Sequence, residues 1–326
     1  MVQPVSPGEE GPHGWGRHGG GGLGATSLRG SCGHRRVVVR SVVVSTSVPA
    51  DPPPSLDERS RPDASNPQSS VYRPGLQVIT RPPGSRPGGP PPWANLPESA
   101  RQHVTVAQVV EAVTERARSG NAPGTDRRMT EFIRSVSGVD PAGRPSAVLV
   151  ALFEDDGEAR VVLTVRSAHL RSHRGEVAFP GGRLEPGEDA DTAALREAGE
   201  EVGLDPSAVT LVGHLTAMPT VSSNTLMTPV VATLADRPTL VRGPDEVDRV
   251  FDVALADLLE DRIFREEWWS IDGRPGADGQ VGSEFPVWFF EAAGEIIWGA
   301  TARVLTELLC VALGLPGPSD RPPPVA

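Results

Sequence analysis

The chain has 326 residues with 31 Lys or Arg and 42 Asp or Glu, which gives a formal net charge of -11 at pH 7. Because a nucleic-acid backbone attracts a basic surface, this acidic balance argues against nonspecific binding to nucleic acid. The two cysteines, Cys32 and Cys310, exclude a disulfide framework and a cysteine-ligated zinc cluster. These features predict a cytoplasmic protein.

Residues 1–92 are rich in Gly, Pro, Ser and Arg, and half of the 34 prolines precede residue 98. Such a segment cannot bury enough apolar surface to offset its chain entropy, so we expect it to be disordered, like the short tail 315–326. The apolar run at 37–48 is too short to span a membrane and contains Arg40. It also lacks a signal-peptide layout, and one hypothesis is that translation starts further downstream.

The globular pattern begins near Trp93 with a helical lead-in, 93–142, which should contain helices near 104–119 and 130–136. A mixed domain, 143–314, follows. In it we expect helices at 190–202 and 300–313, and strands near 146–153, 160–166, 209–218, 228–234, 262–270 and 286–291. Mixed strands with one central and one terminal helix indicate an α/β/α sandwich.

The central helix carries a spaced acidic pattern at residues 182–204. It reads Gly, five residues, Glu, seven residues, Arg-Glu, an aliphatic, any residue, Glu-Glu, any residue, Gly, an aliphatic. Asp189 and Asp191 favour the start of a helix, and Gly203 suits its C-terminal cap. Arg196 should reach Glu188 and brace the loop against this helix.

Three glutamates of the pattern, Glu197, Glu200 and Glu201, stand at i, i+3 and i+4 and therefore share one helical face. Like charges placed so closely repel one another unless a cation neutralises them. Carboxylate oxygens are hard ligands and favour Mg²⁺ or Mn²⁺. Alone, Glu-x-x-Glu-Glu would indicate a solvated surface. The glycines of Phe179-Pro-Gly-Gly182 just upstream allow backbone to approach an ion closely, and this favours a metal-phosphate site.

The complete pattern at 182–204 resembles the Nudix box, and the resemblance extends over about 143–314. It implies an α/β/α fold and a Mg²⁺- or Mn²⁺-dependent hydrolase of nucleoside diphosphate derivatives. By the same resemblance, the metal ligands are Glu197, Glu200, Glu201 and the carbonyl of Gly181, while Glu188 and Arg196 are supporting residues. The segment 245–259 is similar to an acid-valine stretch and short helix found late in such domains. Nudix enzymes place the general base variably, so both Glu201 and Glu246 are candidates.

A second pattern precedes the box at residues 162–182. Leu163-Thr164-x-Arg166-Ser167, followed by Arg171, Gly175 and Phe-Pro-Gly-Gly, resembles the signature of the coenzyme A pyrophosphatase branch; Val162 stands in place of its first leucine, and Glu176 where glutamine is more usual. Guanidinium groups bind phosphate bidentately, so Arg166, Arg171 and Arg174 are candidate contacts for the 3'-phosphate of coenzyme A. Alternatively, these arginines pair with the surplus acids of the chain.

Other residues have weaker interpretations. His169 and His173 are spaced i, i+4 but have no accompanying HExxH glutamate or cysteine, which favours a polar role over zinc ligation. Trp268 and Trp269 are adjacent in a predicted strand and point to opposite faces. At most one could stack on adenine, and packing in the core is favoured.

The favoured function is hydrolysis of coenzyme A or its thioesters to 3',5'-ADP and 4'-phosphopantetheine or its acyl form. One alternative is a Nudix hydrolase of ADP-ribose, a dinucleoside polyphosphate or an oxidised nucleotide. A non-catalytic nucleotide sensor is a second alternative, although it would be expected to lose box glutamates that this chain keeps. The sequence leaves open the acyl preference, the metal, and whether the chain forms a homodimer.

Overall fold

The computed structural model describes residues 71–72, 79–119, 124–137, 143–170, 173–220, 225–243, 246–270 and 284–318. The chain divides into two units, 1–36 and 37–326, and every described residue belongs to the second. Cys32, the apolar run at 37–48 and Arg171 lie outside the described residues. In the part of the chain that is described, no helix is long and apolar enough to cross a membrane.

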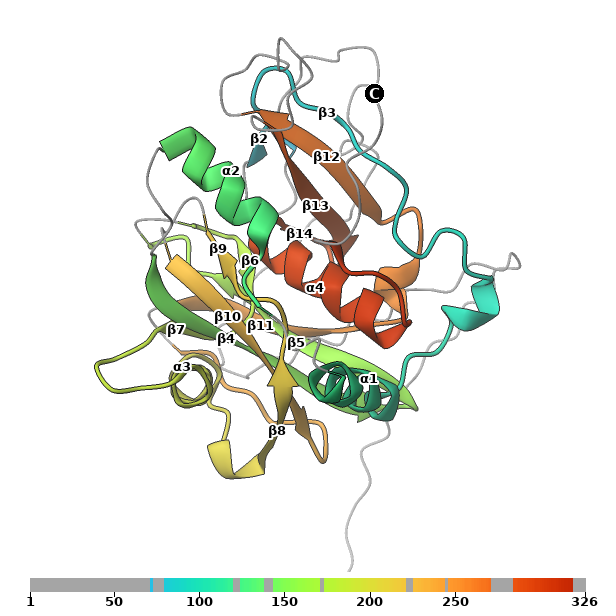
Figure 1. Ribbon diagram of the computed structural model, residues 1–326. Helices are drawn as coiled ribbons and strands as arrows, with labels where there is room; N and C mark the ends of the chain where they lie inside the picture. Colours follow the sequence, from blue (N-terminus) through green and yellow to red (C-terminus); the bar gives the residue numbers. More distant parts are fainter. Residues whose placement is uncertain are drawn as a thin grey trace, which may run out of the picture. The chain divides into compact units, whose positions relative to one another are not determined.

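The centre of the fold is an eight-stranded mixed sheet (Figure 1). Its main path runs β11 (Val247–Ala254), β5 (Glu158–Arg166), β4 (Arg144–Asp155), β10 (Thr225–Leu234) and β8 (Val209–His214). β4 and β10 are parallel, whereas the other neighbours are antiparallel. Three short strands complete the sheet: β6 (Val177–Ala178) pairs with β5, β7 (Gly181–Arg183) with β4, and β9 (Met218–Pro219) with β10.

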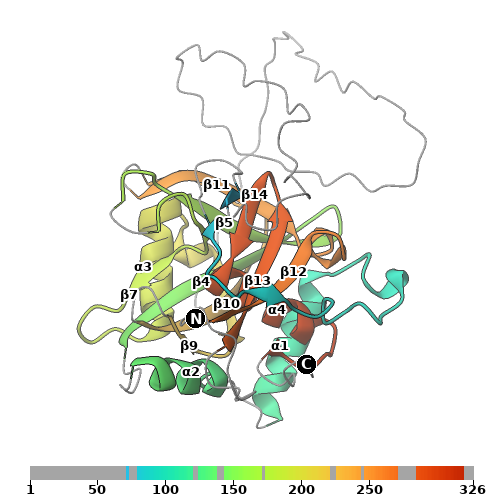
Figure 2. The same cartoon turned by 90° about the horizontal axis from the view of Figure 1, so that it is seen from above.

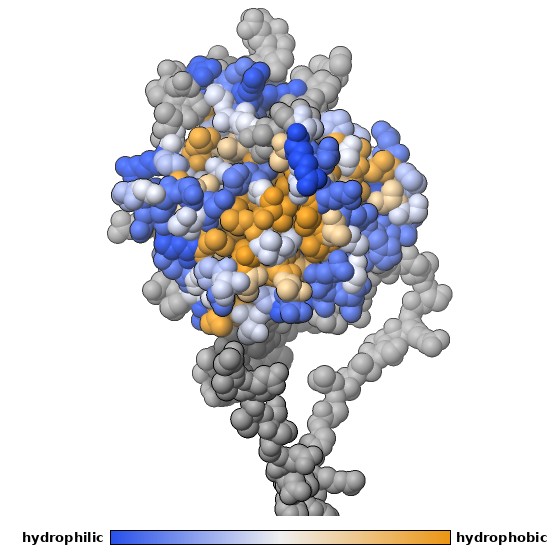
Figure 3. All heavy atoms as spheres, turned by 60° about the horizontal axis from the view of Figure 1, so that its bottom comes forward, coloured by the Kyte–Doolittle hydropathy of each residue, from blue (hydrophilic) through white to orange (hydrophobic). Residues whose placement is uncertain are grey.

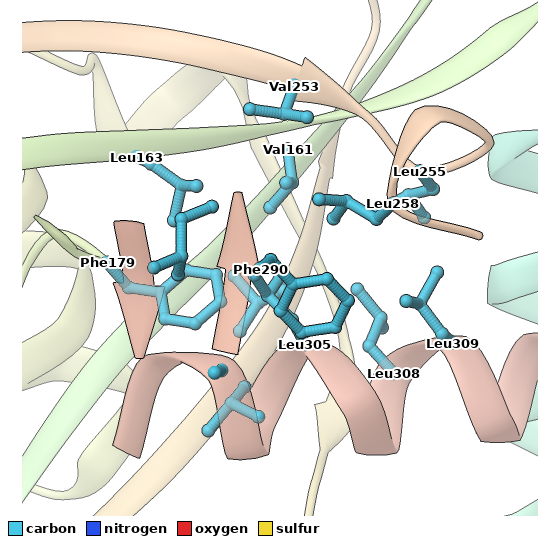
Figure 4. Packing of buried hydrophobic residues seen from close by; sticks show 14 of the residues in the cluster. Val161, Leu163, Phe179, Val253, Leu255, Leu258, Phe290, Leu305, Leu308 and Leu309 are labelled. Atoms are coloured by element: carbon cyan, nitrogen blue, oxygen red, sulfur yellow. The ribbon is translucent and has the colours of Figure 1, made fainter. Parts of the chain in front are cut away.

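Alternate side chains of β4 enter two different cores, as expected for a strand buried on both faces. Leu149, Ala151 and Phe153 belong to one core, which α3 (Ala190–Val202) covers. Val150 and Leu152 belong to the other, which α1 (Val106–Arg118) and α4 (Gly299–Ala312) cover. Figure 4 shows this second core, with Leu305, Leu308 and Leu309 of α4 facing side chains of β5. The predicted α/β/α sandwich is therefore confirmed.

A four-stranded antiparallel sheet adjoins the second core (Figure 2). Its order is β14 (Glu295–Trp298), β13 (Glu284–Ala292), β12 (Phe264–Ser270) and β3 (Arg86–Pro87). Trp268 and Trp269 of β12 are both buried: the guanidinium of Arg86 lies over Trp268, and Trp269 packs against Phe289 and Trp298. Trp269 therefore packs in a hydrophobic cluster of this sheet, while Trp268 is buried beneath Arg86.

The remaining elements are short or lie in the lead-in. Thr105 and Gln108 form a capping box at the start of α1, and Asp126 accepts a hydrogen bond from the N–H of Met129 at the start of α2 (Arg127–Ser137). In the segment similar to the acid-valine stretch, the described residues 246–259 contain β11 and then one 3-10 turn. The other short elements are β1 (Val71–Tyr72), β2 (Ile79–Thr80) and the 3-10 turns Glu98–Ala100, Pro206–Ala208 and Asp257–Leu259.

One face of the molecule carries apolar surface. The lower side of Figure 1, turned forward in Figure 3, has hydrophobic side chains at its centre with hydrophilic ones around them. Two large hydrophobic side chains are notably exposed among the described residues, Leu211 at 41% and Val241 at 53%. Leu211 lies on β8, which is the end strand of the eight-stranded path.

The ordered chain begins earlier than residue 93, so the prediction of disorder up to residue 92 is wrong for 79–92. β3 pairs with β12, and the N–H of Gly88 donates to the carbonyl of Glu266 at 2.7 Å. Arg86 Nη2 lies 2.8 Å from Glu284 Oε2. These partners come from the other end of the chain, so local composition could not reveal them. The tail is also ordered at its start, because Leu315 packs against the core.

We expect deletion of residues 1–70 to leave the melting temperature within about a degree of the full chain, because no described contact is lost. Deletion of residues 1–92 should lower it by several degrees, since it removes β3, its ion pairs and about 1–3 kcal/mol of satisfied hydrogen bonding at Glu266 and Glu284. Calorimetry of both truncations beside the full chain tests this. Equal melting temperatures for the two truncations would show that β3 contributes nothing to stability.

Candidate active site

Local capping defines the helix that carries the acidic pattern. Asp189 is the N-cap of α3 and accepts a hydrogen bond from the N–H of Thr192 at 2.8 Å. Gly203 ends the helix in the left-handed region, with φ 66°. The helix therefore occupies the residues that its caps predict, and it holds all three glutamates of the candidate metal site.

Arg196 braces the preceding loop, as the spacing predicts. Its Nε lies 2.8 Å from Glu188 Oε1, and its Nη2 donates to the carbonyl of Arg183 at 3.0 Å. Glu188 in turn accepts a hydrogen bond from the N–H of Glu185 at 2.8 Å. The hydrogen bond from Arg196 lowers the pKa of Glu188. Glu188 is therefore ionised and anchors the loop. A carboxylate with a lowered pKa is not suited to donate a proton.

The three helical glutamates occupy different environments. The side chain of Glu201 is 5% exposed, that of Glu197 17% and that of Glu200 62%. Burial raises the pKa of Glu201 to about 7, against the hydrogen bond that its Oε2 accepts from the N–H of Gly181 at 3.1 Å. Burial is also the first cause of the raised pKa of Glu197, and the nearby charges of Glu200 and Glu246 add to it.

Two glycines bring the backbone of β7 against this face. A Cβ on Gly182 would lie 2.2 Å from Glu197 Oε1, and a Cβ on Gly181 would lie 2.4 Å from the carbonyl oxygen of Ala147. Backbone atoms of β4 therefore leave no room for a side chain at Gly181, whereas a side chain at Gly182 would displace the carboxylate of Glu197. The close approach of β7 is what places the N–H of Gly181 within reach of Glu201.

The donor set fits a hard divalent cation. Glu197 and Glu201 are largely buried carboxylates with raised pKa values, so a bound cation would offset both their desolvation and their mutual repulsion. Across the described residues, no three His, Cys, Asp or Glu side chains already gather as a metal cluster. The exposed Glu200 instead points to Arg196, whose Nη1 is 3.4 Å from Glu200 Oε2 and 3.1 Å from Glu197 Oε1.

The second signature reaches the same face through Arg166. Its Nη1 lies 3.6 Å from Glu201 Oε1 and its Nη2 lies 3.6 Å from Glu246 Oε2. The structure thus brings together Arg166, Glu201 and the distant Glu246. Arg174 is turned away to its own loop, where its Nε donates to the carbonyl of Leu170. Arg171 lies outside the described residues.

Sequence reasoning missed one pair beside this site. His173 Nδ1 lies 2.7 Å from Glu176 Oε2, and His173 adopts a positive φ of 57°. The i, i+3 spacing of a histidine and a glutamate was the available signal. It was obscured because an irregular loop, unlike a helix, does not tell which neighbours face each other.

Comparison with known proteins agrees with this geometry. A family model described as "NUDIX domain" matches residues 143–270. The chain is 37% identical over 169 residues to an uncharacterized Nudix hydrolase, NudL, of Escherichia coli O7:K1, covering 51% of this chain and 81% of that protein. The chain therefore belongs to the Nudix hydrolase family.

Two eukaryotic relatives are matched over a smaller share of their own length. Nudix hydrolase 3 of Caenorhabditis elegans is 42% identical over 144 residues, which is 40% of this chain and 60% of that protein. Nudix hydrolase 22, chloroplastic, of Arabidopsis thaliana is 39% identical over 189 residues, which is 55% of this chain and 59% of that protein. The chain thus spans about 60% of the length of these relatives.

Among solved structures, a Nudix hydrolase from M. smegmatis, RenU, aligns with a TM-score of 0.30 and 24% identity over 36% of this chain and 73% of that chain. A C. elegans Ap4A hydrolase aligns with a TM-score of 0.31 and 21% identity over 36% of this chain and 84% of that chain. Family membership rests on the sequence relatives and on the box, not on these alignments.

Substitution by alanine should have different effects at Gly181 and at Gly182. Gly182→Ala displaces only the end of the flexible Glu197 side chain, so the protein should fold with nearly the wild-type melting temperature while turnover falls at least about tenfold. Gly181→Ala collides with backbone and should cost about 1–3 kcal/mol of stability. Thermal melting and steady-state kinetics of both variants test this. Unchanged turnover in Gly182→Ala would show that the position of Glu197 is unimportant.

Proposed function

We propose that the chain hydrolyses the diphosphate of coenzyme A or acyl-coenzyme A, with Mg²⁺ or Mn²⁺, to 3',5'-ADP and 4'-phosphopantetheine or its acyl form. One observation carries the proposal. Arg166, the arginine of the second signature, lies 3.6 Å from Glu201 of the box, so the two patterns contribute to one site. The catalytic domain would be residues 143–314, with 93–142 packed against it, in a cytoplasmic protein.

Glu197, Glu200 and Glu201, with the carbonyl of Gly181, would hold the divalent ion. When bound, such an ion polarises the diphosphate and makes the attacking water more acidic. Arg196 would keep the carboxylates of Glu197 and Glu200 on the substrate side of α3, because it contacts both of them and is itself fixed by Glu188.

The chain's own residues can also bind and orient the substrate. Arg166 presents two guanidinium nitrogens at the mouth of the glutamate face, which suits bidentate contact with a phosphate. Two carboxylates flank this guanidinium, Glu201 and Glu246, and either could accept the proton of the attacking water. Glu201 is buried and Glu246 is 56% exposed, so Glu246 can reach bulk solvent to release that proton.

The second signature favours coenzyme A over other diphosphates because of charge. Coenzyme A carries a 3'-phosphate in addition to its diphosphate, and one arginine cannot serve both groups. Arg171 and Arg174 follow Arg166 in the sequence and would supply the second cationic contact. Arg174 would have to leave the carbonyl of Leu170 to do so.

Removing one ligand charge while keeping its shape should test the metal site. We expect Glu200→Gln and Glu201→Gln to lower kcat by at least about 100-fold, as loss of a strong electrostatic contribution to the transition state typically does. Assays at saturating Mg²⁺ and Mn²⁺, and again with chelator, measure this. Glu111→Gln, an exposed glutamate on α1, is the matched control and should keep full activity.

More than a tenth of wild-type activity in both box variants would refute the assigned ligands. Glu246→Gln separates the two candidate bases, because a loss as large as that of Glu201→Gln would place proton abstraction at Glu246. A loss of less than about threefold would leave Glu201 as the base, since general-base catalysis typically contributes 100-fold or more.

A comparison of substrates with and without the 3'-phosphate tests the coenzyme A assignment. Wild type should prefer coenzyme A over 3'-dephospho-coenzyme A; Arg171→Ala should shrink that preference, whereas Arg166→Ala should lower kcat/KM for both forms. A lost charge-assisted contact is worth about 1.5–3 kcal/mol, or roughly ten- to a hundredfold in kcat/KM. Chromatographic product analysis should include ADP-ribose and dinucleoside polyphosphates. Equal cleavage of the two coenzyme A forms, or faster cleavage of ADP-ribose, would overturn the coenzyme A assignment but leave the metal site intact.

A further inference from the structure

The loop between β5 and β6 starts after Arg166, and its far end is hydrogen-bonded to the backbone of Arg166. The N–H of Arg166 donates to the carbonyl of Glu176 at 2.9 Å, and the N–H of Gly175 donates to the carbonyl of Arg166 at 3.0 Å. One step further on, the N–H of Ser167 donates to the carbonyl of Glu246 at 2.8 Å. The backbone of Arg166 is therefore held by the returning end of its own loop and by the segment that carries Glu246.

The returning end contains an unfavourable backbone conformation. His173 has φ 57°, in the left-handed region that a residue with a Cβ avoids, and Gly175 follows with φ 67°. Two interactions oppose the strain at His173: its Nδ1 lies 2.7 Å from Glu176 Oε2, and its carbonyl accepts from the N–H of Glu176 at 3.3 Å. The side-chain pair thus closes a turn whose last residue, Glu176, is bonded to Arg166.

The groups around His173 shift its pKa in opposite directions. The hydrogen bond with Glu176 is the first cause that raises the pKa of His173, while burial and the charge of Arg166 on β5 act in the opposite direction. Both side chains are partly buried, His173 at 27% and Glu176 at 30% exposed. The partner Glu176 therefore favours the protonated form of His173, close to the guanidinium of Arg166.

We propose that His173 and Glu176 are a positioning pair that holds Arg166 in its phosphate-binding place, and that the pair is strongest while His173 is protonated. The proposal rests on the proposed function in one respect, namely that Arg166 binds a substrate phosphate. It does not require that the substrate is coenzyme A, because the pair acts on the backbone of Arg166 and not on a particular ligand.

The direction of the pH effect follows from linkage. A group whose pKa is raised in the folded protein contributes fully below its ordinary value, 6.5 for histidine, and loses that contribution as the pH rises through the raised value. The loop should therefore loosen, and KM rise, on the alkaline side. kcat should change little, because the glutamates of α3 do not contact the pair.

Variants of both partners test the pair. In Glu176→Gln the pKa of His173 should fall, and the rise of KM with pH should begin at a correspondingly lower pH. His173→Asn keeps a residue that tolerates positive φ but cannot titrate; KM should be about three- to tenfold higher at pH 6 to 7 and lack the alkaline rise, with kcat within about twofold. His169→Asn, which replaces an exposed histidine of the same loop, is the matched control and should match wild type.

Two readouts are needed. Proton–carbon NMR of labelled histidine, assigned by His173→Asn, follows the titration of His173 without any substrate. KM and kcat are then measured against pH with whichever diphosphate of the panel is cleaved fastest, so that titration of the substrate is common to all variants. A failed coenzyme A assignment leaves the NMR result unchanged, and therefore the two failures are distinguishable.

Three outcomes would overturn the proposal. In the first, the His173 titration has the same midpoint in wild type and Glu176→Gln. In the second, His173→Asn keeps the wild-type dependence of KM on pH, or loses kcat at unchanged KM, which would place the ring in the chemistry. In the third, His173→Gly, which relieves the positive φ and removes the ring, binds substrate as tightly as wild type. That result would make the backbone conformation sufficient without the pair.

Discussion

The close contact between β7 and the glutamate face of α3 is the constraint on which the site depends. β7 pairs with β4 of the central sheet, so its backbone cannot retreat from the helix. In this position the N–H of Gly181 donates a hydrogen bond to the buried Glu201 and stabilises its charged form. Glycine at both positions is a consequence of that contact, since any side chain would occupy the space of a carboxylate or of β4 backbone.

The charges of the site follow from the same constraint. Three glutamates on one helical face repel one another, and two arginines limit the cost: Arg196 from within the helix and Arg166 from β5. Arg196 is tied to Glu188 and to a backbone carbonyl, so it is fixed. Arg166 lies 3.6 Å from both Glu201 and Glu246, contacts that are longer than hydrogen bonds, so its guanidinium is held less firmly than that of Arg196.

The sequence predicted the parts of the site that depend on local spacing. Helix α3, its caps and the contact of Arg196 with Glu188 all lie within one loop-helix-loop, where spacing determines geometry. The place of Glu246 beside Arg166 depends on the pairing of β11 with β5, which is a long-range contact. The order of 79–92 depends likewise on β12, far along the chain. The composition of a segment indicates how much apolar surface it can bury by itself. It does not indicate which contacts a distant segment will make with it.

Strand order also explains how two separate sequence patterns form one site. β6 and β7 follow each other in the chain and pair with β5 and β4, which are neighbours in the sheet. The segment from Arg166 to Gly182 therefore leaves the end of one strand and returns across the next, which brings the signature arginine and the box glycines to the same edge. On this geometry, the loop that joins them sets the distance between the guanidinium of Arg166 and the glutamates. On the proposed function, a rigid loop would keep that distance constant before substrate arrives, and both backbone hydrogen bonds to Arg166 and the pair of His173 with Glu176 restrain this loop.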